Sequence, residues 1–108
     1  MCMTKGTKPR RHERISLPKG MDVVWYGAGQ QQVSRVRTLG MGGAFILAPI
    51  SPALGTNLKL IFQVPGGVVS ADAVVRNIVP GEGMGVEFTK LGATDRDLLE
   101  QLLKRLLR

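Results

Sequence analysis

Residues 57–79 read NLKLIFQVPGGVVSADAVVRNIV, two mostly apolar runs on either side of the turn Pro65-Gly66-Gly67. Proline followed by glycine between two such runs is typical of the turn of a β-hairpin. The segment therefore predicts two long antiparallel strands, over residues 57–64 and 68–79, that pair with each other.

Short apolar runs separated by glycine and proline also occupy the sequence on both sides of this hairpin. The chain has 14 glycines and 6 prolines in 108 residues, which favours strands joined by turns over a helix bundle. We expect four further strands, over residues 21–26, 30–38, 44–47 and 84–88. Six antiparallel strands in succession fit a small closed or split barrel, because closure removes the exposed edges.

The apolar residues change to a helical period after Thr94. Six leucines recur at that spacing: Leu98, Leu99, Leu102, Leu103, Leu106 and Leu107. They predict one C-terminal helix over about 94–107, with Thr94 and Asp97 spaced as the N-cap and N3 residues of a capping box. The open end of the barrel would cover the leucine face, and self-association as a homodimer is the alternative. The predicted fold is thus mostly β, a six-stranded antiparallel barrel with a C-terminal α-helix.

The net charge of +7 is concentrated at the N-terminus. Residues 1–19 contain six basic residues against Glu13 alone, a balance of +5: Lys5, Lys8, Arg10, Arg11, Arg14 and Lys19. We therefore divide the chain into a flexible basic arm, residues 1–19, and one barrel domain with its helix, residues 20–108. A basic arm attracts anions such as phosphodiesters, nucleic acids or acidic lipid head groups. A solvated tail that only aids solubility is the alternative.

Residues that could support metal binding or catalysis are few. The chain has one histidine, His12, and one cysteine, Cys2, so we expect neither a metal site nor an internal disulfide. Its eight carboxylates are scattered, without a pair that suggests acid and base roles. Gly40-Met41-Gly42-Gly43 lacks the lysine and Ser/Thr of a phosphate-binding loop and leads into a strand rather than a helix. We expect no enzymatic activity and no cofactor.

The apolar runs and the N-terminus also predict where the protein is found. No run approaches the roughly 20 residues that cross a bilayer. The first five residues, MCMTK, lack the apolar core of a signal peptide. We therefore expect a cytoplasmic protein without membrane insertion.

Three sequence features are each weak alone, but their order and spacing in the chain are specific. They are the pair Arg10-x-x-x-Arg14, the glycine-rich turn Thr38-Leu39-Gly40-Met41-Gly42-Gly43 with Ala44-Phe45-Ile46, and the strand Gly83-Met84-Gly85-Val86-Glu87-Phe88. Together they resemble a PilZ domain over residues 9 to 107. The resemblance implies a six-stranded barrel with a C-terminal helix that binds the bacterial second messenger cyclic di-GMP. It therefore implies a receptor rather than an enzyme.

The resemblance also implies a set of ligand-binding residues: Arg10, Arg11, Arg14, Thr38, Gly40, Gly42 and Gly43. Arginine can hold a phosphate, grip one guanine edge with two hydrogen bonds or stack on a purine face. We expect Arg10 and Arg14 to contact the ligand, Arg11 to support a phosphate contact and the arm to order on binding. The turn is expected to bring backbone amides close to the ligand, and Gly43 to allow approaches that a Cβ would hinder.

Two positions of the turn depart from the family pattern. Thr38 stands where the family has Asp or Asn, and Gly40 stands where it has Ser. The two lost groups correspond to roughly 2 to 4 kcal/mol of hydrogen bonding. That predicts binding on the order of 30-fold to a thousandfold weaker. Arg35 and Arg37 would add phosphate contacts if they face the site, and the sequence leaves their faces open.

These observations support three functions, in decreasing order of preference. The first is a cyclic di-GMP receptor that passes the ordering of its arm to an unidentified effector protein. The second is a PilZ-like module that binds no nucleotide and docks a partner through its helix or barrel. The third, nonspecific nucleic-acid binding, is disfavoured because the chain has only one Trp, one Tyr and three Phe, most of them in apolar strand runs.

Overall fold

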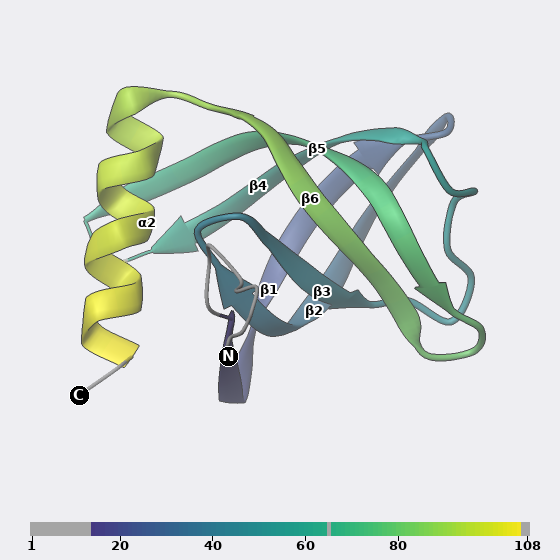
Figure 1. Ribbon diagram of the computed structural model, residues 1–108, viewed down its shortest axis with the longest axis horizontal. Coiled ribbons are helices and arrows are strands. Elements are labelled where there is room, and N and C mark those ends of the chain that lie inside the picture. Colours follow the sequence, from purple (N-terminus) through teal and green to yellow (C-terminus); the bar gives the residue numbers. More distant parts are fainter. Residues whose placement is uncertain (1–13, 65, 107–108) are drawn as a thin grey trace, which may run out of the picture.

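The computed structural model describes residues 14–64 and 66–106, which form six antiparallel strands and one helix (Figure 1). The elements are β1 (Arg14–Gly27), β2 (Gln30–Gly40), β3 (Gly43–Leu47), β4 (Asn57–Val64), β5 (Gly67–Val79), β6 (Gly83–Leu91) and α2 (Ala93–Leu106). The strands close into a barrel in the order β1-β2-β3-β6-β5-β4. The helix lies across one end of this barrel (Figure 1). The predicted fold class is confirmed.

The hairpin of residues 57–79 forms two adjacent strands of the barrel wall. Strands β4 and β5 pair in one continuous register, from Asn57 opposite Val74 to Val64 opposite Gly67. Buried and exposed residues alternate along most of β4, because one face of the strand lines the core and the other meets solvent. Gly66 in the turn has φ +96°, a conformation that glycine adopts without strain.

The core fills the barrel and continues beneath the helix. The largest fully buried side chains include Trp25, Leu39, Ile46, Leu60, Met84 and Leu99. The Trp25 indole N–H donates to Ser34 Oγ at 2.9 Å, so this ring is buried without losing its hydrogen bond. Three leucines of α2 are buried in the same cluster: Leu99, Leu102 and Leu103. The leucine face therefore covers the barrel end, as predicted.

The first strand begins earlier than the sequence indicated. We expected a strand from Met21, whereas β1 starts at Arg14, so residues 14–19 belong to the barrel wall rather than to the arm. Pro18 and Gly20 lie within the first half of β1. The sheet accommodates them, since the pairing of β1 with β2 only shifts register between Ser16 and Met21. Residues 1–13, which include Arg10 and Arg11, lie outside the described residues, and the flexibility expected of them stays a prediction.

The helix also begins before its predicted first residue. It starts at Ala93, and the Arg96 N–H donates to the Gly92 carbonyl at 2.8 Å. Gly92 is therefore the N-cap, and the capping box with Thr94 as N-cap is wrong. Asp95, in the first turn, accepts a hydrogen bond from the Ser70 N–H of β5 at 3.0 Å, which ties the helix to the wall. Within the described part of the chain, no helix has the length and apolarity to span a membrane.

Candidate ligand-binding face

The glycine-rich turn between β2 and β3 is tighter than its sequence indicated. Thr38 and Gly40 are still part of β2, and Gly43 is the first residue of β3. Only Met41 and Gly42 lie between the strands. Four of the six predicted turn positions, Thr38, Leu39, Gly40 and Gly43, are therefore strand positions with fixed cross-strand neighbours.

Gly43 is required by the packing of β3 against β6. It pairs with Glu87, and a Cβ at position 43 would collide with the carbonyl oxygen of Val86. The carbonyl of the preceding Gly42 accepts a hydrogen bond from the Phe88 N–H at 2.9 Å. The close approach at Gly43 is one of backbone to backbone, and its expected role toward a ligand stays a prediction.

The pairing of β1 with β2 brings the second motif arginine to this turn. Arg14 is the register partner of Gly40, and Ser16 is the partner of Thr38. The structure thus places three of the predicted ligand-binding residues, Arg14, Thr38 and Gly40, at neighbouring positions of two adjacent strands. Ser16 was absent from the sequence prediction, because only the register shows that it lies opposite Thr38. As ligand contacts, all of these residues stay predictions.

Arg37, the residue before Thr38, has partners that the sequence did not reveal. Its Nη1 donates to Glu82 Oε1 at 3.1 Å, and its guanidinium carbon lies 5.5 Å from the centroid of the Phe45 ring. Phe45 is in turn the register partner of Thr38. Arg37 and Glu82 are 45 positions apart in the chain, so only the strand order of the barrel brings them together. No local pattern could have identified this pair.

Other arginines on the barrel surface are also in ion pairs. Arg35 Nε lies 3.9 Å from Asp22 Oδ1, and Arg76 Nε donates to Glu87 Oε1 at 2.7 Å. Both arginine side chains are about 60% exposed, so these pairs add little to the free energy of unfolding. Their main effect is to balance positive charge on the barrel wall.

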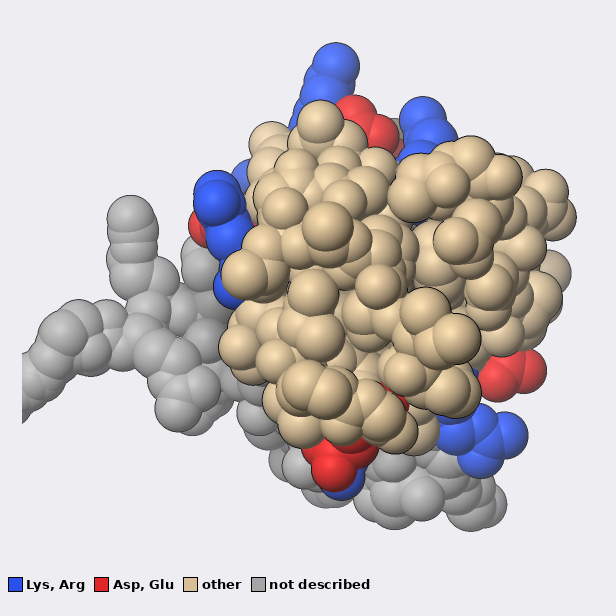
Figure 2. Space-filling model, turned by 90° about the vertical axis from the view of Figure 1, so that its right-hand side faces the viewer, with Lys and Arg blue, Asp and Glu red and all other residues tan. Residues whose placement is uncertain are grey.

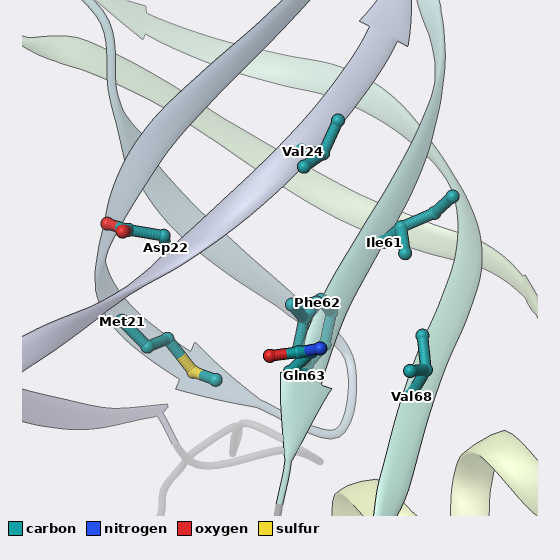
Figure 3. Close-up of a pocket in the computed structure, with 7 residues that line it drawn as sticks. All are labelled: Met21, Asp22, Val24, Ile61, Phe62, Gln63 and Val68. Atoms are coloured by element: carbon teal, nitrogen blue, oxygen red, sulfur yellow. The ribbon is translucent and has the colours of Figure 1, made fainter.

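Two hollows bear on where a ligand could bind. One, of about 220 Å³, adjoins the glycine-rich turn and is lined by residues that include Met41, Gly42, Lys90 and Arg96. The other, of about 510 Å³, opens where β1 and β4 diverge beyond their last pair, Val24 with Ile61 (Figure 3). None of the residues that line this larger hollow belongs to the predicted ligand-binding set. Among the described residues, no group of three or more His, Cys, Asp or Glu is placed to hold a metal ion.

The barrel end away from the helix presents a largely uncharged surface. Figure 2 shows this end with lysine, arginine and carboxylate side chains only around its rim. The β3–β4 loop lies here (Figure 1), and it carries two strongly exposed apolar side chains, Ile50 at 84% and Leu54 at 62%. Both side chains belong to the same loop, and contiguous apolar surface is the feature that marks sites where proteins bind.

The sequence matches one protein family over nearly its whole length. Residues 8–105 match the PilZ domain, so the chain belongs to the PilZ family. This family binds cyclic di-GMP, and its domains are non-catalytic receptor modules. The predicted resemblance and the expected lack of enzymatic activity are thereby confirmed. No curated protein matches the chain.

Solved structures of PilZ proteins share the fold at low sequence identity. The inhibitor of motility MotI/DgrA of Bacillus subtilis has a TM-score of 0.76 at 22% identity, covering 93% of this chain and 52% of that one. The PilZ domain of YcgR from Escherichia coli, solved with c-di-GMP, has a TM-score of 0.73 at 20% identity, covering 94% and 93%. PlzA of Borreliella burgdorferi in complex with c-di-GMP has a TM-score of 0.70 at 16% identity, covering 87% and 40%. The chain thus spans about half of MotI/DgrA and nearly all of the YcgR domain.

Proposed function

We propose that this chain is a cyclic di-GMP receptor whose N-terminal arm orders over the ligand and passes that change to an effector protein. The observation that carries the proposal is the β1–β2 register, which places Arg14 opposite Gly40 beside the turn. The match to the PilZ family includes both Arg10 and Arg14. The effector and a cytoplasmic location stay predictions.

The chemistry of the proposed site suits a dianionic dinucleotide. Cyclic di-GMP offers two phosphates and two guanine bases, and an arginine fork can bond either group with charge-assisted hydrogen bonds. Arg10 and Arg14 would make these contacts, with Arg11 adding a phosphate contact. Thr38 retains a hydroxyl where the family has a carboxylate or amide, and Gly40 offers only its backbone. We therefore expect weaker binding than a complete motif provides, by about 30-fold or more.

Isothermal titration of the chain with cyclic di-GMP tests this function directly. We expect saturable binding, and we expect the double variant Arg10→Ala, Arg14→Ala to lose it because both ligand-gripping guanidinium groups are gone. The matched control is Lys104→Ala, Arg105→Ala, which removes the same charge from the last turn of α2. This control should bind as the unmodified chain does.

Two results would contradict the proposal. One is the absence of heat from the unmodified chain at ligand concentrations up to about 1 mM. The other is equal binding by the Arg10→Ala, Arg14→Ala variant, which would show that the arm does not contact the nucleotide.

Docking of a partner protein without nucleotide is the second candidate function. The uncharged barrel end with Ile50 and Leu54 favours it, and the changes at Thr38 and Gly40 are consistent with it. The leucines of α2 offer little apolar surface to a partner, since none within its described residues is exposed and three are buried. This function predicts partner capture that is indifferent to added cyclic di-GMP.

A further inference from the structure

The guanidinium of Arg37 has a defined position on the outside of the barrel. Glu82 Oε1 accepts its Nη1 hydrogen bond at 3.1 Å, and the ring of Phe45 lies beneath it at 5.5 Å. Glu82 is itself held by the backbone, because its carbonyl accepts a hydrogen bond from the Ala48 N–H at 3.0 Å. The guanidinium of Arg37 is therefore oriented by Glu82 at its side and by the Phe45 ring beneath it.

Gly83 of β6 makes room for the aromatic ring in this arrangement. Gly85 is the register partner of Phe45, and a Cβ at Gly83 would meet Phe45 Cε2 at 2.9 Å. A Cβ at Gly85 would lie 4.0 Å from Phe45 Cδ1. An aromatic ring packed across a strand glycine is a stabilising cross-strand pair. The absence of a side chain at Gly83 thus lets the Phe45 ring pack on β6, where it supports the Arg37 guanidinium.

The side of the guanidinium that faces away from Phe45 is open. The Arg37 side chain is 52% exposed even though it contacts both the ring and Glu82. A guanidinium has five N–H donors, and the described hydrogen bond to Glu82 uses one of them. A planar cationic face and several donors are therefore available to a ligand.

Arg37 is next to residues of the proposed nucleotide site in the strand register. Arg37 directly precedes Thr38, and Phe45, whose ring lies beneath Arg37, is the register partner of Thr38. Two residues further along β2, Gly40 is the register partner of Arg14. We infer that Arg37 is a further ligand-binding residue, which stacks its exposed guanidinium face on one guanine base of cyclic di-GMP. Arginine planes stack well on purines, and Phe45 fixes this plane before the ligand arrives. This contact adds to the affinity for the ligand next to Thr38, one of the two positions at which the chain lacks the family's polar group.

Three variants test the stacking role, which rests on the proposed function. In titrations with cyclic di-GMP, we expect Arg37→Ala to weaken binding about tenfold. Arg37→Lys should weaken it nearly as much, because lysine keeps the charge but has no planar face. Arg76→Ala is the matched control, since Arg76 is also an exposed arginine bonded to a glutamate, here at 2.7 Å. It should bind within about twofold of the unmodified chain.

The outcomes distinguish three possibilities for Arg37: it stacks on the base, it contributes only its charge, or it does not contact the ligand. Full affinity in Arg37→Ala, with binding still lost in Arg10→Ala, Arg14→Ala, would overturn the role of Arg37 and leave the receptor function standing. Full affinity in Arg37→Lys would also overturn it, because charge alone would then suffice. An unmodified chain that binds no cyclic di-GMP overturns both the receptor function and this inference. Circular dichroism of each variant confirms that the barrel is folded.

Discussion

Single glycines decide how closely the strands of this barrel approach each other. Gly43 and Gly83 both lie where a Cβ would strike a backbone carbonyl, that of Val86 in one case and of Ile46 in the other. Backbone atoms cannot move aside as the end of a flexible side chain can. The two residues therefore have a structural role on β3, which carries Phe45, and on its neighbour β6.

The substitution Gly43→Ala tests this role. It should lower the free energy of unfolding by about 1 to 3 kcal/mol, because β3 and β6 must separate to admit the methyl group. Urea unfolding followed by the fluorescence of the buried Trp25 measures the change. Gly85→Ala is the matched control on β6, since its Cβ would make only ordinary contacts, 3.4 Å from Asn77 Cβ and 4.0 Å from Phe45. Equal stability of Gly43→Ala and the unmodified chain would contradict the packing argument.

Among the elements, α2 is stabilised by its packing on the barrel, and its buried leucines are part of the barrel's core. A 14-residue helix is marginal by itself in water, so its stability comes from burying Leu99, Leu102 and Leu103 over the barrel end. Its first turn is fastened to β5 by the hydrogen bond from Ser70 to Asp95. The leucine face that suggested a homodimer is already occupied by the chain's own barrel.

Shortening one of these leucines should therefore destabilise the whole domain. We expect Leu99→Ala to lower the free energy of unfolding by about 2 to 5 kcal/mol, because Leu99 is fully buried and its removal leaves a cavity. Leu106→Ala removes the same atoms from a half-buried position and should cost clearly less. Chemical denaturation measures both values. A loss at Leu99 no larger than at Leu106 would mean that the helix is not part of the core.

At the scale of the whole molecule, the two ends of the barrel differ in chemistry. One end is covered by α2, and the other presents the uncharged surface with Ile50 and Leu54 (Figures 1 and 2). The proposed nucleotide site involves β1, β2 and the turn into β3, and none of its predicted residues belongs to the β3–β4 loop. Nucleotide binding and protein docking can therefore be separated by substitution.

The double variant Ile50→Glu, Leu54→Glu makes that separation. Because both side chains are exposed, we expect the urea midpoint to change little and the affinity for cyclic di-GMP to stay within about twofold of the unmodified chain. Val68→Glu, at a 48% exposed apolar position on β5, is the control for adding charge elsewhere. A large loss of nucleotide affinity in the double variant alone would show that this end takes part in the ligand site. A partner protein lost only by the double variant would favour the docking function.

The predicted ligand site was only partly accessible from the sequence. The motif arginines and the glycine-rich turn stand out because each is a short run of unusual residues. Ser16 and the pair of Arg37 with Glu82 could not be found in this way, since their relevance depends on which strands lie side by side. The start of β1 was missed because the charge of residues 1–19 assigned them to the arm, although pairing with β2 begins at Arg14.

Local sequence patterns by themselves determined the six strands, the hairpin at Pro65-Gly66-Gly67 and the helix, because alternation, turn residues and leucine spacing act over a few residues. They also located the excess positive charge in residues 1–19. Only the tertiary structure decided that Arg14 lies opposite Gly40, that Gly43 must lack a side chain and that Arg37 lies on Phe45. The physical reason is that strand register and barrel closure depend on how all six strands pack around one core. Residues far apart in the chain therefore become neighbours only when that core forms.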